Sequence, residues 1–400
     1  MTTKVVYLDN AATSWPKPPQ VMAAMQHYLG EVGANPGRSG HRLSIEAARV
    51  VYRTREAVAG LLGVSDPLRV VFCANGTHAL NLALFGLLEP GQHVVTTGME
   101  HNSVMRPLRV LEAGGVAVSV VPCSSQGVLD PAVVEQALRP QTALIVMTQA
   151  SNVVGTLLPV REVAAIARAH GVPLLVDGAQ SVGAMPIDME ELGVDLLAFT
   201  GHKSLYGPTG TGGLVIGERM DAGRLRPFMC GGTGSRSESQ NQPEFLPDKF
   251  ESGTVNAVGL AGLEAGVRWV LDQGVEQLRD RGRELTKRLI EGLANIEGAT
   301  VHGTRDAARQ LPAVSFTLDC LEPGELGLLL DERFGIAARV GLHCSPLAHS
   351  TLGTFPTGTV RFSPSALNTV ADVDAAIDAV RQVAGEAGSS ATVKGSDGDR

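Results

Sequence analysis

The chain has no apolar run approaching the roughly 18 residues that a membrane-spanning helix needs. Its first residues also lack the extended apolar core of a secretory signal, because the apolar stretch at 5–8 is short. Cysteine is scarce, and 5 cysteines in 400 residues do not make a disulfide framework. These absences predict a cytoplasmic protein with no membrane partner, in which each cysteine is either core filler or a reactive thiol.

An excess of positive charge is also absent. The 33 Lys and Arg residues are outnumbered by 41 Asp and Glu residues, which gives a formal net charge of -8. A chain with this balance has no general affinity for nucleic acid, so we expect no nucleic-acid partner. The hydrophobic content of 44% is ordinary for a globular protein, and 400 residues are enough for one large and one small domain.

Strand-like and helix-like patterns alternate through the middle of the chain. The expected strands lie at 68–74, 93–97, 116–122, 144–148, 172–176 and 195–199, and the expected helices at 47–62, 77–88 and 160–170. This alternation predicts an α/β fold with a mostly parallel sheet.

The pattern changes after residue 259. A long helical stretch is expected at 260–296, followed by strands near 313–317 and 360–363 and a helix near 371–384. This succession suits a smaller α+β domain. We therefore expect a large domain at 16–260, a small domain formed by 1–15 and 261–384, and a disordered tail at 385–400, which is rich in Gly, Ser and charge.

Lys203 follows the strand-like run 195–199 and precedes a Gly-Pro turn, with Thr200 and His202 close by. A lysine in this setting can form a Schiff base with pyridoxal phosphate while its neighbours hold the phosphate. The alternative is a surface lysine. Upstream, Asp177 ends an apolar run, where a carboxylate can face the pyridine nitrogen of the cofactor. A turn or helix-capping aspartate is the alternative there.

Two other loops offer groups for the same cofactor. Gly76 and Thr77 join a strand to a helix start, where free backbone N–H groups and a hydroxyl can bind a phosphate. His101 follows a strand and can stack on the cofactor ring, although a lone histidine in a loop is more often an ordinary polar residue. Each of these signals is weak when taken singly.

Cys344 lies in a loop flanked by glycine and proline, and this position favours an exposed and mobile thiol. His343 and Arg339 are close in sequence and would favour the nucleophilic thiolate. The usual alternative, a buried structural cysteine, suits Cys73 better because Cys73 follows an apolar run. A zinc site with His343 and His349 lacks a second ligand pair of recognised spacing, so we expect no metal.

Several separate motifs occur in a fixed order along the chain. They are Tyr7-Leu8-Asp9-Asn10-Ala11-Ala12-Thr13, Glu100-His101-Asn102-Ser103, Ala150-Ser151-Asn152-Val153-Val154-Gly155-Thr156, Asp177-Gly178-Ala179-Gln180, Thr200-Gly201-His202-Lys203, Phe250-Glu251-Ser252-Gly253-Thr254 and Arg339-Val340-Gly341-Leu342-His343-Cys344. In this order they resemble the cysteine desulfurase and selenocysteine lyase family, and its group II-like members in particular. The resemblance implies the class-V aminotransferase fold, which is fold type I of the pyridoxal-phosphate-dependent transferases.

The resemblance also implies roles for single residues. Lys203 would hold the cofactor, Asp177 would pair with its pyridinium, and His101 would stack on its ring. The implied phosphate ligands are Gly76, Thr77, Thr200, His202 and, from the partner subunit of a homodimer, Thr254. Gln180 and Asn152 would lie near the phenolic oxygen and the substrate, and Arg361, helped by Asn152 and Arg339, would bind the substrate carboxylate. His78 departs from the family pattern, which often has an acidic residue there, and Thr200 replaces a common serine.

The implied reaction is that of a cysteine desulfurase. L-Cysteine would give its sulfur to Cys344 as a persulfide, L-alanine would leave, and an unidentified acceptor protein would take the sulfur. A selenocysteine or cysteine-conjugate lyase and a small-amino-acid aminotransferase are alternatives on the same fold, and a non-catalytic scaffold is a third. The acceptor and the pathway, iron–sulfur cluster assembly or another, stay open at this point.

Overall fold

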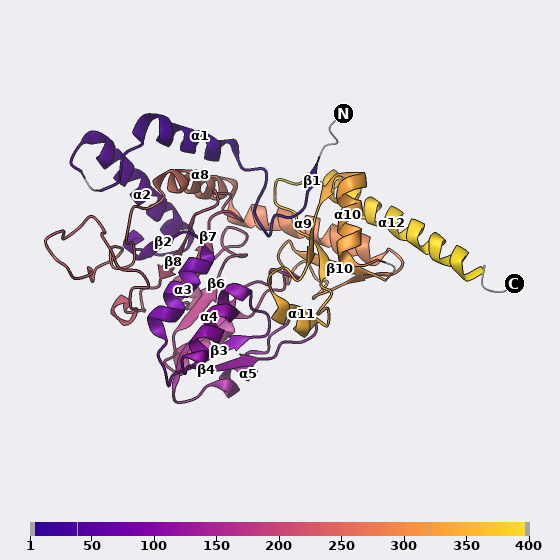
Figure 1. Ribbon diagram of the computed structural model, residues 1–400, viewed down its shortest axis with the longest axis horizontal. Helices are drawn as coiled ribbons and strands as arrows, with labels where there is room; N and C mark the ends of the chain where they lie inside the picture. Colours follow the sequence, from indigo (N-terminus) through magenta and orange to yellow (C-terminus); the bar gives the residue numbers. More distant parts are fainter. Residues whose placement is uncertain (1–4, 38, 320, 397–400) are drawn as a thin grey trace.

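The computed structural model describes residues 5–37, 39–319 and 321–396, with side chains described as far as residue 387 (Figure 1). A seven-stranded sheet forms the centre of its larger part. The strands lie in the order β2 (Val70–Cys73), β8 (Gly212–Ile216), β7 (Leu196–Thr200), β6 (Leu174–Asp177), β5 (Thr142–Thr148), β3 (His93–Thr97) and β4 (Ala117–Val121). Only β8 runs against its neighbours, so the predicted mostly parallel sheet is confirmed.

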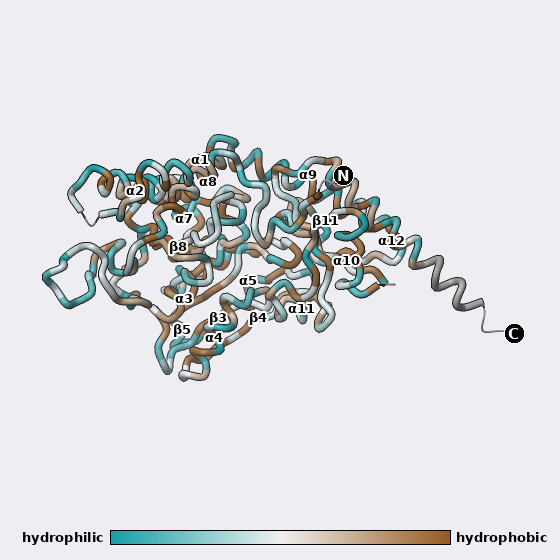
Figure 2. The backbone as a smooth tube through the Cα atoms, turned by 45° about the horizontal axis from the view of Figure 1, so that its top comes forward, coloured by the Kyte–Doolittle hydropathy of each residue, from teal (hydrophilic) through white to brown (hydrophobic). Residues whose placement is uncertain are grey.

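Helices cover both faces of this sheet, and its inner strands are therefore largely apolar and buried. In β6 successive side chains alternate between two core clusters: Leu174 and Val176 pack in one, and Leu175 packs in the other. Helices α2 (Arg42–Leu61) and α6 (Val160–Ala169) contribute to the first cluster, and α3 (Gly76–Leu87) and α4 (Asn102–Ala113) to the second. Figure 2 shows the hydrophobic stretches gathered inside the molecule and the hydrophilic ones at its loops.

A second, four-stranded antiparallel sheet carries the other part of the molecule. Its order is β12 (Arg339–Gly341), β13 (Thr359–Phe362), β10 (Val314–Leu318) and β9 (Ala299–Val301). Its core packs against α9 (Val275–Ala294), α10 (Pro323–Phe334) and α12 (Val370–Ser396). The N-terminal strand β1 (Val6–Tyr7) pairs in parallel with β11 (Ile336–Ala337), and Leu8 enters the same core. The domain bounds proposed from the sequence stay a prediction.

The remaining elements include α8 (Ala257–Gln273), which packs in the first core cluster, and several short elements. The short elements are α1 (Pro19–His27), η1 (Tyr28–Val32), η2 (Pro67–Arg69), α5 (Pro131–Ala137), α7 (Met189–Leu192), η3 (Ala222–Arg224) and α11 (Pro346–Leu352). No helix within the described ranges is both long enough and apolar enough to cross a membrane.

Two expectations for the C-terminal half were wrong. The helix expected at 260–296 is two helices, because Gly274 between α8 and α9 has φ +80°, which ends one helix before the next begins. The tail expected to be disordered from 385 continues α12 as far as Ser396. In this continuation Glu386 pairs with Arg333 of α10 at 2.7 Å and so ties α12 to its neighbour. The last four residues of the predicted tail lie outside the described residues.

Gly155 is a position where close packing and backbone conformation both require glycine. Its φ is +71°, and an added Cβ would lie 2.3 Å from the carbonyl oxygen of Leu311. We predict that Gly155→Ala costs about 1–3 kcal/mol through overpacking, in addition to the cost of its backbone conformation. Gly171→Ala is the matched control, because its φ is +65° with open space around it, and it should cost only about 1 kcal/mol. Thermal unfolding of the two variants measures the difference, and equal midpoints would contradict the prediction.

Candidate active site

A cavity of about 220 Å³ lies at the carboxyl ends of β5, β6 and β7. Parallel strands bring their carboxyl ends to one edge of a sheet, and ligand sites form there. The cavity brings together nearly all of the site residues predicted from the sequence: Gly76, Thr77, His101, Asn152, Asp177, Gln180, Thr200, His202, Lys203, Arg339, Cys344 and Arg361.

Thr254 is the predicted site residue that the structure does not bring to this cavity. It is exposed and lies in a separate groove beside Tyr52 and Asp248, where Asn35 Nδ2 donates a 3.1 Å hydrogen bond to its hydroxyl. Within its own chain Thr254 is therefore no ligand of the site around Lys203. His78 is also turned away, because its ring faces Phe228, with ring centroids 6.0 Å apart.

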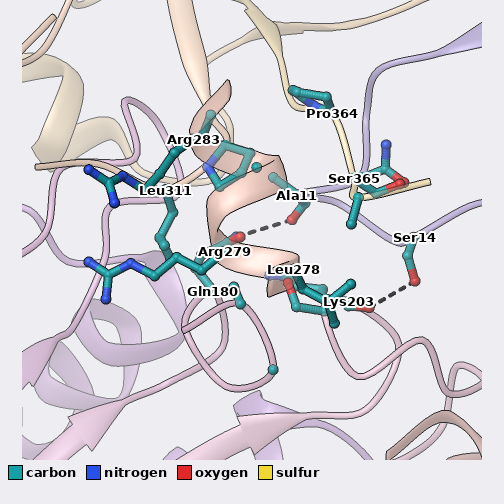
Figure 3. A pocket seen from close by; sticks show the side chains of 18 of the residues that line it. Ala11, Ser14, Gln180, Lys203, Leu278, Arg279, Arg283, Leu311, Pro364 and Ser365 are labelled. Carbon is teal, nitrogen blue, oxygen red and sulfur yellow. Dashed lines mark hydrogen bonds between the residues drawn. The ribbon is translucent and has the colours of Figure 1, made fainter. Parts of the chain in front are cut away.

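Lys203 is held through its backbone by a segment from the other end of the chain. The carbonyl of His202 accepts hydrogen bonds from the backbone N–H of Ser14 at 2.9 Å and from Lys17 Nζ at 3.0 Å. The hydroxyl of Ser14 donates to the Lys203 carbonyl at 2.8 Å. Both residues also line a smaller neighbouring cavity of about 60 Å³, and Figure 3 shows this hydrogen bond there. Ser14 and Lys17 were missed by sequence reasoning, since nothing in the sequence signals a contact across so long a separation.

The amine of Lys203 is poised to lose its proton. Burial, together with Arg361 and Arg339 and against the opposing effect of Asp177, lowers the pKa of Lys203 to about 8. A neutral amine is the nucleophilic form, so this environment suits Schiff-base chemistry.

Asp177 is buried at the end of β6, where its carboxylate accepts a 3.0 Å hydrogen bond from the N–H of Ala179. Burial raises the pKa of Asp177, and the Ala179 N–H and Lys203 partly offset this. Next to it lies Glu100, which is fully buried. Its Oε1 accepts from Thr97 at 2.6 Å and from the N–H of Thr148 at 3.0 Å.

Glu100 is a buried acid that the sequence did not single out. Its Oε2 has no hydrogen-bond partner among the described residues, and burial raises the pKa of Glu100 to about 8. The group is therefore mainly protonated and neutral at pH 7.

The opposite end of the cavity fits a phosphate. Helix α3 begins there at Gly76 and points its first N–H groups at the cavity. Two buried polar atoms beside it, Thr200 Oγ1 and His202 Nδ1, have no partner among the described residues. Burial, Lys203 and Lys17 lower the pKa of His202 to about 4, so its ring is neutral. These unpaired donors, a Schiff-base lysine and a buried carboxylate together fit a phosphorylated pyridine aldehyde.

His101 reaches the cavity from the start of α4. Its Nδ1 accepts a 3.0 Å hydrogen bond from the N–H of Ser103, so the ring caps the helix. Burial and then Lys203 lower the pKa of His101 to about 4, which makes its ring neutral. A neutral, fixed ring suits stacking, and this role stays a prediction.

Two guanidinium groups from the smaller sheet line another side of the cavity. Arg361 of β13 and Arg339 of β12 are direct cross-strand neighbours. Arg361 is 1% exposed, and it donates to Asp9 Oδ1 at 2.7 Å and to the carbonyl of Asn152 at 2.6 Å. Its Nε has no partner in the described part of the chain. An unpaired N–H on one guanidinium, with a second guanidinium beside it, favours binding of a carboxylate.

The loop that carries Cys344 is anchored from several sides. Asn152 Nδ2 donates to the His343 carbonyl at 2.8 Å, and its Oδ1 accepts from the Ser345 hydroxyl at 2.7 Å. The N–H of Asn102 donates to the Cys344 carbonyl at 2.9 Å. Both ends of the Asn152 amide are therefore bound to this loop, while its predicted contacts with cofactor and substrate stay untested. Cys344 itself is exposed.

The expected help of His343 in forming the thiolate is not supported. Burial and Arg361 lower the pKa of His343 to about 2, so its ring carries no positive charge. Its Nε2 faces the carbonyl of Arg339 at 3.4 Å and not the thiol. The cation at the sulfur is Arg339, whose guanidinium donates to Cys344 Sγ at 3.4 Å. Within the described ranges no group of three or more His, Cys, Asp or Glu side chains is arranged to hold a metal ion.

The sequence and the fold match those of one protein family. The family described as aminotransferase class-V matches residues 6–376, and the chain belongs to it. Several relatives that match over nearly the whole chain are named probable cysteine desulfurases. A probable cysteine desulfurase of Methanothermobacter thermautotrophicus is 36% identical over 384 residues, which cover 95% of each chain.

Solved structures agree with this assignment. The apo structure of a cysteine desulfurase from Thermococcus onnurineus matches with a TM-score of 0.89 and 32% identity, over 96% of this chain and 95% of that one. The Escherichia coli cysteine desulfurase CsdA matches with a TM-score of 0.83 and 29% identity, over 94% of each chain. The predicted fold, type I of the pyridoxal-phosphate-dependent transferases, is thereby confirmed.

Because Glu100 is buried, we predict that it makes the free energy of unfolding depend on pH. Its pKa rises from 4.5 to about 8 on folding, so its stabilising contribution is complete below pH 4.5 and is lost as the pH rises through 8. Glu100→Gln keeps the shape and stays neutral, so its unfolding temperature should fall less than that of the wild type between pH 5 and 8. Glu251→Gln, which breaks the buried ion pair with Arg55, is the control and should destabilise at every pH. Parallel pH profiles of the wild type and Glu100→Gln would contradict the prediction.

Proposed function

We propose that the cavity holds pyridoxal 5'-phosphate. Lys203 would form the Schiff base, Asp177 would pair with the ring nitrogen, and His101 would cover the ring. The phosphate would bind at the start of α3 and at the unpaired atoms of Thr200 and His202, which have no other partner in the described chain. When bound, the cofactor supplies an electron sink for the Cα of an amino acid. The lowered pKa of Lys203 supports this assignment.

We further propose that the protein is a cysteine desulfurase that uses L-cysteine. The observation that carries the proposal is an exposed Cys344 in the same cavity as Lys203 and two guanidinium groups. Relatives named as cysteine desulfurases, which match over nearly the whole chain, support the same reaction.

The residues divide the reaction between them. Arg361 binds the substrate carboxylate, with Arg339 beside it. Lys203 Nζ takes the proton from Cα and returns one to the substrate carbon skeleton. The Cys344 thiolate attacks the substrate sulfur, so that an S–S bond forms and the Cβ–S bond breaks. The electron pair stays on carbon, which takes a proton, and L-alanine leaves while Cys344 holds the persulfide. A sulfur-acceptor protein then removes it.

A homodimer would complete the site. Thr254 is exposed and remote from its own cavity, as expected of a residue that serves the cavity of a partner subunit. Large apolar side chains are exposed on α1, η1, α2 and the loop that precedes α8, segments that lie at one end of the molecule in Figure 1. These side chains are Met22, Leu29, Leu43, Ile45, Tyr52, Phe228, Met229 and Phe245. Such a surface favours association with a second copy.

We also propose a cytoplasmic location, because the reaction needs a reduced thiol. The described cysteines Cys73, Cys123, Cys230 and Cys344 are free. Unpaired cysteines are typical of a reducing compartment.

The role of Cys344 is tested by Cys344→Ala. The variant should keep the visible absorbance of its bound cofactor but form no protein persulfide with L-cysteine, because no thiol remains at the substrate sulfur. Mass spectrometry of the protein after incubation detects the added sulfur, and alanine release measures turnover. Cys230→Ala is the matched control, since Cys230 is also exposed but lies outside the cavity. Wild-type turnover by Cys344→Ala would disprove the mechanism.

Product analysis separates the alternatives that share the cofactor. A desulfurase gives equal amounts of L-alanine and persulfide sulfur, whereas an aminotransferase gives an oxo acid and leaves the cofactor as the amine. A lyase specific for selenocysteine would act on that substrate and not on L-cysteine.

The role of Arg361 is tested by Arg361→Lys. Lysine keeps one positive charge but loses the planar pair of donors that suits a carboxylate. We predict that kcat/KM for L-cysteine falls by about 10- to 100-fold, which corresponds to one lost hydrogen bond to a charged group. Arg109→Lys, in an exposed ion pair on α4, is the control and should have no effect. An unchanged kcat/KM in a correctly folded Arg361→Lys protein would contradict the assignment.

A further inference from the structure

We propose that His349 is a positioning residue for Cys344, and that it acts through His343 and Arg339 on the loop that presents the thiol. The inference rests on the proposed function only in taking Cys344 as the sulfur-accepting residue. His349 lies on α11, outside the residues that line the cavity, and no substrate or cofactor contact is assigned to it.

The backbone of this loop needs support. His343 and Cys344 are consecutive non-glycine residues with φ of +48° and +59°. Each left-handed residue is disfavoured unless the surroundings hold it. Asn152 holds one side of the loop through its amide. On the other side lie His343 and His349, whose side chains are 3% and 0% exposed.

The hydrogen bonds between these groups have a single direction. The carbonyl of Arg339 can only accept, so His343 Nε2 donates to it across 3.4 Å. Because the neutral His343 ring carries its proton on Nε2, its Nδ1 is unprotonated and accepts from His349 Nε2 at 3.3 Å. His349 Nδ1 in turn accepts from the hydroxyl of Thr354 at 2.7 Å. The donor and acceptor of each hydrogen bond are therefore fixed, from the Thr354 hydroxyl through both rings to the Arg339 carbonyl.

Both rings must be neutral for this order to hold, and their surroundings make them so. The charged and titratable groups that face the pair are Arg339, Arg361 and His302, and each of them disfavours a second positive charge. Burial together with these groups lowers the pKa of His343 to about 2 and that of His349 to about 4. The chain of donors therefore stays intact throughout the physiological pH range.

The end of this chain is the residue that touches the reacting sulfur. Arg339 is held at its carbonyl by His343, and its guanidinium donates to Cys344 Sγ. His343 is also the residue directly before Cys344. Loss of His349 would leave Nδ1 of the His343 ring without its donor, so the ring would be free to turn. The thiol of the next residue, Cys344, would then be displaced.

The test is the rate at which iodoacetamide alkylates Cys344, measured by mass spectrometry from pH 5 to 9. It is made on the holoenzyme and repeated after removal of the cofactor. His349→Leu should change the rate by about threefold or more, the scale of one lost hydrogen bond. It should add no inflection in the histidine range, because burial and Arg361 still hold the pKa of His343 well below its ordinary value. His349→Gln keeps an N–H donor toward His343 and should restore the wild-type profile. His170→Leu, an exposed histidine, is the control.

The outcomes are decisive in each case. A folded His349→Leu protein with a wild-type alkylation profile overturns the proposal. If His349→Leu does not fold, Thr354→Val takes its place, since it removes the donor to His349 Nδ1. An altered profile in Thr354→Val together with a wild-type profile in His349→Gln supports the proposal, and wild-type profiles in both overturn it. Alkylation needs no L-cysteine, so its outcome does not depend on the desulfurase assignment. That assignment is tested separately, by persulfide formation at Cys344.

Discussion

The whole site depends on one loop, residues 151–156, which is hydrogen-bonded to both sheets of the molecule. It continues β5 of the larger sheet, and its carbonyls accept from side chains of the smaller one: Asn152 from Arg361, and Val153 from the Ser315 hydroxyl at 2.6 Å. Gly155 accepts from the N–H of Leu311 at 2.8 Å. These buried carbonyls would be costly to leave unpaired, so the two sheets are fixed against each other at this point. Arg361 therefore faces the edge where Lys203 lies.

Burial then sets the charge of each group in the cavity. It lowers the pKa of His101 and His202 to about 4, so that both rings are neutral. Glu100 is also held neutral, because burial raises its pKa to about 8. Beside the amine of Lys203, the positive charge of the cavity is carried by guanidinium groups, whose planar donors match a carboxylate. Selectivity for an amino-acid substrate follows from this separation of neutral supporting groups and charged binding groups.

The sequence predicted those parts of the site that local patterns determine. Asp177 and Thr200 end apolar strands, and parallel strands bring such ends together, so their proximity to Lys203 follows from the pattern. The helix break at Gly274 and the continuation of α12 were not predicted. Glycine is compatible with both a break and a helix, and the contact that ties α12 down comes from α10, which is distant in sequence.

Contacts between residues distant in sequence also explain why some site contacts were not predicted. Ser14 and Lys17 hold the backbone at Lys203 across most of the chain, and Asn152 gives its amide to a loop of the other sheet. Such contacts depend on how the two sheets pack, and no spacing rule in the sequence contains that information. The family resemblance identified Asn152 as a site residue. It implied contacts with the cofactor and the substrate, but not the contacts that Asn152 makes with the Cys344 loop.

In the proposed reaction the thiol meets two partners of very different size. The substrate sulfur would reach Cys344 from within the cavity, whereas an acceptor protein would approach from solvent. An exposed cysteine at the rim satisfies both, but exposure alone would leave the side chain free to turn away from the substrate. The sequence suggested a mobile loop, yet Asn102 and Asn152 donate hydrogen bonds to its backbone carbonyls, and its own Ser345 hydroxyl donates to the Asn152 side chain. A cost in backbone strain at His343 and Cys344 is therefore consistent with a thiol that must point in one direction while staying open to both partners.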